Sequence, residues 1–379
     1  RRQRQMCIRD SMNVVQIVSH FDLGGAERIA INIAKSKESD INYHMIEVVR
    51  GSSNFSRDYM KELETAGIKY YRSPFTNSKM GIVFFPIRLI ALIKKVCPIA
   101  IHTHTEIPDL SLYWTCLLAP RIMQDIKIVR TLHNTVLWNK WKSIGRVVEK
   151  FMQKHKANIS TSNMITCTYQ KEFGFDSNIK LIYNGFTAIS QQIYPYIYSG
   201  KINILFAGRF VPQKGIPVLI NIIKRVDEKV FYFHIAGKGP LEEIILQELG
   251  NKSNVRITPP IFSLAQYLSS FDYVFIPSEH EGLNSLSIES SINKVPVIIN
   301  DIDGLNETLP QNYPLKVKNN CIDEYMTLFT DVIPTIDRVS LIDSVYQYSC
   351  QKFDIQQMQK QYEYIYKTGK KYGCFFHEK

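Results

Sequence analysis

The sequence has little cysteine, with seven in 379 residues. The number is odd, and no two of the cysteines have the spacing of a metal site or a disulfide framework. This pattern excludes a small disulfide-stapled secreted domain and gives no support for a zinc module. A reducing cytoplasm is the compartment that this cysteine usage predicts.

Long apolar runs are also missing. The longest, residues 82–93, contains Pro86 and Arg88 and is shorter than the roughly 20 residues that a membrane-spanning helix needs. The first eleven residues have no apolar core of the signal-peptide kind. A strand-like run begins at Met12, so we expect residues 1–11 to be a non-native leader.

Hydrophobic residues make up 45% of the chain and charged residues 21%, which is typical of a globular protein of about two domains. The net charge of +11 is unevenly distributed. Residues 12–186 carry 23 Lys/Arg against 14 Asp/Glu, whereas residues 187–379 carry 19 against 20. We therefore expect the first half to face something anionic, such as a membrane surface, a phosphorylated acceptor or nucleic acid.

Short β-rich runs alternate with helical stretches through residues 12–186. Strands are predicted at 14–20, 43–49, 99–105 and 126–134. The repeated strand–helix order predicts an α/β domain with a parallel, doubly wound sheet.

The pattern restarts after residues 187–200, which lack periodicity and are predicted to be a linker. A second α/β domain is predicted over residues 201–351, followed by a C-terminal segment, 352–379, with a helix starting near Phe353. The chain is thus predicted to hold two Rossmann-like domains, with the ligand site in a cleft between them.

The segment SEHEGLNSLSIES leads from a buried strand through a turn into a helix. The backbone N–H groups of Asn284, Ser285 and Leu286 would be free at the helix start and form an anion site. Glu281 in the turn and Glu289 on the helix suit sugar and ribose hydroxyls. The alternative is a loop glutamate and a solvated helix glutamate.

The segment FAGRFVPQKGIPVLI also leads from a strand into a helix. Arg209 and Lys214 flank its loop, and two cations at a helix start can neutralise a diphosphate. The alternative is a plain surface loop.

A third strand-to-helix turn, HFDLGGAERIA, contains Gly24 and Gly25. Glycines there let the backbone approach a ligand closely. The turn does not match G-x-G-x-x-G, so it gives no support for a dinucleotide cofactor. The alternative is a tight structural turn.

Three histidines end strands of the first domain. His133 is predicted to bond the transferring sugar, and His104 to lie on the acceptor side. His102 and His104 alternate in IHTHT, which raises a metal site as an alternative. No third ligand has recognisable spacing, so no metal is predicted, and His102 is interpreted as a structural histidine.

Residues 138–156 combine Trp138 and Trp141 with a run of cations that includes Lys142 and Arg146. This basic amphipathic stretch is typical of helices that lie on an anionic membrane. We therefore predict contact with a membrane or a lipid-linked acceptor. A solvated helix face is the alternative.

Taken in order, these motifs resemble one family. They are GGAER (24–28), HTH (102–104), TLHN (131–134), NG (184–185), AGRFVPQKG (207–215), AGKGP (236–240), SEHEG with IE (278–289), PVI (296–298) and GLNE (304–307). Over Met12 to about Tyr366 the chain resembles the retaining GT-B glycosyltransferases of family 4 (glycosyl transferases group 1). The resemblance implies two Rossmann-like domains facing across a cleft, with a C-terminal helix crossing back to the first.

The resemblance also implies roles. Residues 12–186 would bind the acceptor and residues 201–351 the NDP-sugar donor, without metal or further cofactor. It implies that Glu289 holds the donor ribose and that Glu281 and His133 contact the donor sugar. The phosphates would be contacted by Arg209, Lys214 and Gly25.

The function expected from these features is retaining transfer of a sugar from an NDP-sugar to a glycan or lipid-linked, membrane-associated acceptor. The setting would be surface polysaccharide assembly (capsule, O-antigen or exopolysaccharide) at the inner face of the plasma membrane, without nucleic acid. One alternative is a sugar-nucleotide epimerase on the same fold. The other is a basic membrane- or nucleic-acid-binding module without catalysis.

Overall fold

The computed structural model describes residues 12–368 except 23, 38, 54 and 140. The expected leader, 1–11, and residues 369–379 of the C-terminal segment lie outside the described residues. The described chain forms two compact units. Residues 186–354 make up the second unit, and the remainder makes up the first.

The first unit is built on a sheet of seven strands in the order β3-β2-β1-β4-β5-β6-β7, in which every pairing is parallel. The strands are β1 (Met12–Val18), β2 (Ile41–Glu47), β3 (Lys69–Tyr71), β4 (Ala100–Thr103), β5 (Lys127–Leu132), β6 (Asn158–Ser160) and β7 (Lys180–Leu181). The central strand β1 is apolar apart from Asn13 and Gln16, and its residues from Val14 to Val18 are buried, as expected for a parallel strand that is covered on both faces.

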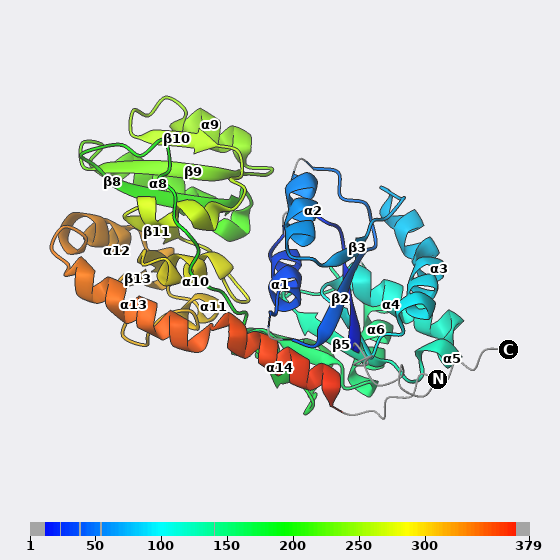
Figure 1. Cartoon of the computed structure of the whole chain (residues 1–379). Helices are drawn as coiled ribbons and strands as arrows, with labels where there is room; N and C mark the ends of the chain where they lie inside the picture. The colour runs from blue at the N-terminus through cyan, green and yellow to red at the C-terminus, as the bar shows by residue number, and fades with distance from the viewer. Residues whose placement is uncertain (1–11, 23, 38, 54, 140, 369–379) are drawn as a thin grey trace, which may run out of the picture. The chain divides into compact units, whose positions relative to one another are not determined.

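Helices cover both faces of this sheet. They are α1 (Gly25–Ala34), α2 (Phe55–Thr65), α3 (Ser78–Val96), α4 (Glu106–Leu118), α5 (Pro120–Met123), α6 (Lys142–Lys154), α7 (Asn163–Phe173) and α14 (Ile355–Lys367). Helix α4 packs against both α3 and α6, and these three lie on the opposite side of the sheet from α1 (Figure 1). This arrangement follows from right-handed crossovers on the two sides of β1.

Helix α14 belongs to the first unit although it comes last in the described chain. Met358, Tyr362 and Ile365 lie on its buried face, as the helical spacing predicts. The side-chain amide of Gln359 donates to the carbonyl of Asn32 in α1, at 2.6 Å. The predicted return of the C-terminal helix to the first domain is confirmed.

The second unit has a six-stranded parallel sheet in the order β10-β9-β8-β11-β12-β13. Its strands are β8 (Ile202–Arg209), β9 (Phe231–Lys238), β10 (Val255–Thr258), β11 (Tyr273–Ile276), β12 (Val297–Asn300) and β13 (Lys316–Val317). Its α-helices are α8 (Ile216–Arg225), α9 (Glu242–Leu249), α10 (Ser285–Ile292), α11 (Asp303–Asn306), α12 (Ile322–Thr327) and α13 (Arg338–Lys352). Short 3-10 helices are η1 (Pro212–Lys214), η2 (Leu264–Ser270) and η3 (Lys318–Asn320), and η4 (Leu328–Val332) is a π-helix. The prediction of two Rossmann-like α/β domains is confirmed.

Residues 187–200, predicted to be a linker, are instead part of the second unit. Tyr194 is 5% exposed, and its backbone N–H donates to the Ser270 hydroxyl at 2.9 Å. The N–H of Gln192 donates to the carbonyl of Gln266 at 2.7 Å. This irregular segment lacks periodicity because it bonds to a neighbouring loop instead of forming a helix or strand.

Within the part of the chain that the structure describes, no helix combines the length and the apolar composition that crossing a bilayer requires.

Candidate active site

In the second unit, the turn η1 after β8 is tied to the loop after β11. The carbonyl of Gln213 accepts from the N–H of Glu279, and its side-chain amide donates to the carbonyl of His280, both at 2.9 Å. Gly215 follows with a φ of +69°, and a Cβ there would lie 1.9 Å from the carbonyl oxygen of Pro277. Glycine is therefore required after Lys214, because both the backbone angle and the close approach exclude a side chain.

This clamp brings Lys214 and Glu281 together. The Nζ atom of Lys214 lies 2.5 Å from Oε1 of Glu281, and the Asn284 side-chain amide donates to the same oxygen at 3.0 Å. The Glu281 side chain is 9% exposed and that of Lys214 is 19% exposed. The sequence pointed to both residues but not to their direct contact across 67 positions. A charged pair at a partly open edge can present a cation and a carboxylate to one ligand.

Helix α10 begins beside this pair. Asn284 is its N-cap, and Oδ1 of Asn284 accepts from the N–H of Ser287 at 2.9 Å. The helix starts at Ser285, so Ser285 and Leu286 are its first two residues and their N–H groups point out of its N-terminus. Glu289 is half-buried on the same helix, and its contact with a ribose stays a prediction.

Arg209 is the last residue of β8, and its side chain is exposed. The end of the neighbouring strand β9 approaches β8 closely, since a Cβ on Gly237 would lie 2.0 Å from the Gly208 carbonyl oxygen. A Cβ on Gly239 would lie 2.6 Å from the carbonyl oxygen of Phe210. These glycines of the AGKGP motif let the loops after β8 and β9 meet at the same sheet edge as Lys214.

In the first unit, the two glycines at the start of helix α1 differ. A Cβ on Gly24 would lie 2.1 Å from Oε2 of Glu27, whose side chain folds back over the turn, whereas a Cβ on Gly25 would meet no atom within 4 Å. Burial raises the pKa of the Glu27 carboxyl. The close contact at Gly24 is with the end of a flexible side chain, and no atom of the fold approaches Gly25. Close approach of a ligand therefore stays the predicted reason for Gly25.

His133 follows β5 and stands at the end of a histidine row. Its Nε2 lies 3.2 Å from Nδ1 of His104, and Nε2 of His104 lies 2.9 Å from Oε1 of Gln16. The rings of His102 and His104 are 4.1 Å apart. His104 is 1% exposed, so it is not a surface group on the acceptor side. It orients the ring of His133 through the contact between their ring nitrogens.

His102 has two hydrogen-bond partners. Its ring nitrogens lie 2.7 Å from the hydroxyls of Tyr366 on α14 and of Thr131 on β5. The prediction of a structural histidine is confirmed.

Burial holds the histidine row in the neutral form. Desolvation lowers the pKa of His133 to about 3 and that of His102 and His104 well below the usual value. When Oε1 of Gln16 accepts from His104, Nδ1 of His104 must accept from His133. His133 then keeps its Nδ1 as an acceptor, a group that suits a hydroxyl better than a phosphate.

The predicted membrane side of residues 138–156 needs one correction. Trp138 is 3% exposed, and its indole N–H donates to Oε1 of Glu149 at 2.6 Å. Its ring packs on Gly145, where a Cβ would lie 2.3 Å from Cγ of the indole. The ring is therefore a core group, whereas Trp141 is 39% exposed and Lys142 and Arg146 lie on the surface.

A buried ionic cluster, which the sequence did not reveal, explains this. Arg130 on β5 lies 2.7 Å from Asp109 of α4 and 2.6 Å from Glu149 of α6. The Tyr169 hydroxyl donates to Glu149 at 2.7 Å. Buried charges need such complete pairing, so Glu149 is turned inward and does not neutralise the cations on the outer face of α6.

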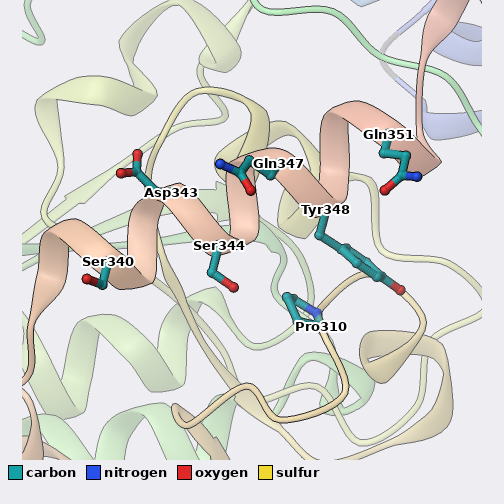
Figure 2. A pocket seen from close by; sticks show the side chains of 7 residues that line it. All are labelled: Pro310, Ser340, Asp343, Ser344, Gln347, Tyr348 and Gln351. Atoms are coloured by element: carbon teal, nitrogen blue, oxygen red, sulfur yellow. The ribbon is translucent and has the colours of Figure 1, made fainter.

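No group of three or more His, Cys, Asp or Glu side chains within the described residues could hold a metal ion. An open depression of ≈ 560 Å³ lies along α13, lined by Pro310 and by residues of that helix such as Asp343 and Tyr348 (Figure 2). It contains none of the predicted site residues, and we assign it no role.

With this geometry in place, comparisons identify the class of protein. A model of the Glycosyltransferase Family 4 domain matches residues 23–188, and a model described as Glycosyl transferases group 1 matches residues 201–328. The crystal structure of Anabaena HepE in complex with UDP-glucose superposes with a TM-score of 0.76 at 17% identity, covering 93% of this chain and 99% of that one. At that identity the likeness shows the fold alone. The chain belongs to the GT-B glycosyltransferases.

Curated relatives agree with this class. An uncharacterized glycosyltransferase of Methanocaldococcus jannaschii, MJ1178, is 29% identical over 52% of this chain. The chain spans about half of that relative and of a Klebsiella pneumoniae protein in the cps region, at 56% and 50%. The capsular polysaccharide biosynthesis glycosyltransferase CapH of Staphylococcus aureus is 24% identical over 77% of this chain and 82% of its own length.

Proposed function

We propose that the protein transfers a sugar from an NDP-sugar to a glycan or lipid-linked acceptor in surface polysaccharide assembly. The observation that carries the proposal is the Lys214–Glu281 pair, held by Asn284 at the start of α10. The name of the CapH relative supports the polysaccharide setting, and the UDP-glucose of the Anabaena structure supports the donor class.

In this proposal the second unit binds the donor. Lys214 and Arg209, with the N–H groups at the start of α10, bind the diphosphate. Glu281 accepts hydrogen bonds from the sugar, and Glu289 from the ribose. As the bond to the sugar breaks, negative charge accumulates on the diphosphate, so a fixed cation beside it stabilises the transition state more than the ground state.

We propose retention of anomeric configuration. The departing diphosphate accepts the proton of the incoming hydroxyl on the face that it leaves, so the new bond forms on the same face. Side-chain cations stabilise the negative charge of the leaving diphosphate, without metal or further cofactor. The free Nδ1 of neutral His133 accepts a hydrogen bond from a sugar hydroxyl, and the ring holds no charge that would attract the phosphates.

The test is product analysis with UDP-glucose and a lipid-linked glycan acceptor. We expect a product whose new linkage has the anomeric configuration of the donor, as read from its NMR coupling constant, and no altered sugar nucleotide when acceptor is left out. An inverted linkage would overturn retention. Conversion of the donor to its epimer without acceptor would establish the epimerase alternative.

A further inference from the structure

Helix α3 of the first unit carries a row of exposed apolar side chains. Met80, Val83, Phe84 and Ile87 are 44%, 63%, 37% and 67% exposed. Their spacing of three, four and seven residues places them on one face. Single exposed apolar residues are ordinary, but such a row marks an interaction surface.

Helix α6 carries a second row. Trp141, Ile144 and Val147 are 39%, 48% and 49% exposed and three residues apart. Phe151, one turn after Val147, packs its ring against Tyr113 of α4, with 5.3 Å between centroids. The apolar side of α6 is therefore the side that faces α4.

Helix α4 lies between the two rows, since it packs against both α3 and α6. Its own Trp114, Leu117 and Leu118 are 45%, 52% and 65% exposed. All three helices cover the same face of the sheet (Figure 1). We call the exposed side chains of α3, α4 and α6 on this layer the apolar face.

The exposed charges of α6 are positive. Lys142, Arg146 and Lys150 are exposed on α6. Glu149, the acidic residue of this helix, is 2% exposed and paired with Arg130. The spacing of four residues between Lys142, Arg146 and Lys150 places these cations on the other flank of α6 from the apolar row. Apolar and cationic flanks on one exposed helix are typical of helices that lie on a bilayer containing anionic lipids.

We propose that the apolar face docks on an anionic lipid bilayer. The apolar side chains of α3 and α6 enter the boundary between headgroups and acyl chains, and the cations of α6 meet the headgroup phosphates. The bilayer extends the proposed function and rests on it, because a lipid-linked acceptor is presented at such a surface. In place of the two tryptophans expected from the sequence, Trp141 and the row on α3 would make the membrane contact.

Co-sedimentation of the full chain with vesicles tests the proposal. The vesicles contain either phosphatidylcholine alone or equal parts of phosphatidylcholine and phosphatidylglycerol. We expect binding to the anionic vesicles, a lower bound fraction at higher salt, and little binding to the neutral ones. Absence of binding to the anionic vesicles would overturn the proposal.

The decisive variant is Val83→Ser combined with Ile87→Ser, which removes apolar area without changing charge. We expect the partition coefficient to fall about tenfold, because binding scales with buried apolar area. The matched control is Ile244→Ser with Leu246→Ser on α9 of the second unit, where the side chains are 45% and 50% exposed. Equal loss in the two double variants, or no loss on α3, would contradict the assignment of the surface.

Two further readings separate the outcomes. Melting temperatures of both double variants verify folding, and UDP binding by each reports the proposed donor site independently. If Val83→Ser with Ile87→Ser changes the oligomeric state while vesicle binding persists, the apolar face is a protein interface and the proposal fails. Absence of binding of UDP, GDP and ADP to the wild type would count against the proposed function and not against the docking surface.

Discussion

The two units present opposite chemistry at the ends of their strands. In the second unit, the loops after β8 and β11 hold a charged pair, Lys214 with Glu281, at a partly open edge. In the first unit, the row from His102 to His133 is neutral because burial lowers the pKa of each imidazole. Both units have the same kind of sheet, so the difference lies in the side chains that follow the strands.

This contrast fits a division of tasks. A nucleoside diphosphate needs cations and helix N–H groups, which the second unit provides. A hydroxyl needs neutral donors and acceptors with fixed geometry, which His133 provides through His104 and Gln16.

Removing either member of the charged pair should have the largest effect. Lys214→Ala and Glu281→Ala should each lower turnover by about 100-fold or more. The first variant loses the cation beside the leaving diphosphate, and the second loses the carboxylate that holds the sugar and pairs with Lys214. The control is Lys224→Ala, which removes an exposed ion pair with Glu248 in the same unit. Initial rates of sugar transfer provide the measurement, and near-normal rates in both site variants would refute the assignment.

Gly215→Ala should destabilise the second unit strongly. Gly200 is a matched control, since it also has a positive φ, +82°, but an added Cβ meets no atom within 4 Å. Gly200→Ala should cost about 1–2 kcal/mol for the backbone angle. Gly215→Ala should cost clearly more, because its Cβ collides with the Pro277 carbonyl. Urea unfolding gives both values, and equal costs would show that the clamp between the two loops is weak.

Gly25→Ala should lower transfer about tenfold, since the added methyl group displaces a closely held ligand. Stability should stay unchanged or rise by up to about 1 kcal/mol, because alanine favours the helix. In Gly24→Ala, by contrast, the end of the Glu27 side chain must move to admit the new Cβ, so we expect no comparable gain in stability. Full activity in Gly25→Ala would contradict the prediction that Gly25 lies against the ligand.

His133→Gln should have the smallest effect, a loss of about three- to tenfold, equivalent to one neutral hydrogen bond. Because its pKa is lowered to about 3, His133 stays neutral from about pH 5 to pH 8, and its protonation begins only at lower pH. The pH–rate profile in this window should therefore have the same shape in the variant and the wild type, with exposed His155→Gln as the control. An inflection near neutral pH that only the wild type shows would contradict a neutral His133.

The order of strands and helices was predictable because apolar runs and glycine turns are local signals. Contacts between distant positions were not. Lys214 meets Glu281 across 67 residues, and Trp138 faces inward because Glu149, eleven residues later, accepts its N–H. In the sequence, a tryptophan among lysines looks the same whether it lies on an exposed helix face or is buried beside a carboxylate. The orientation depends on Arg130, which only the folded sheet brings to Glu149.

The measurement closest to the central claim is a calorimetric titration of UDP and, separately, GDP and ADP into the wild type, Lys214→Ala and the Lys224→Ala control. If the second unit holds the donor diphosphate through Lys214, at least one nucleotide should bind the wild type and the control equally. The same nucleotide should bind Lys214→Ala at least about tenfold more weakly, as expected for a charge-assisted bond. Equal affinity for Lys214→Ala and the wild type, or no binding of any of the three nucleotides to the wild type, would contradict the account.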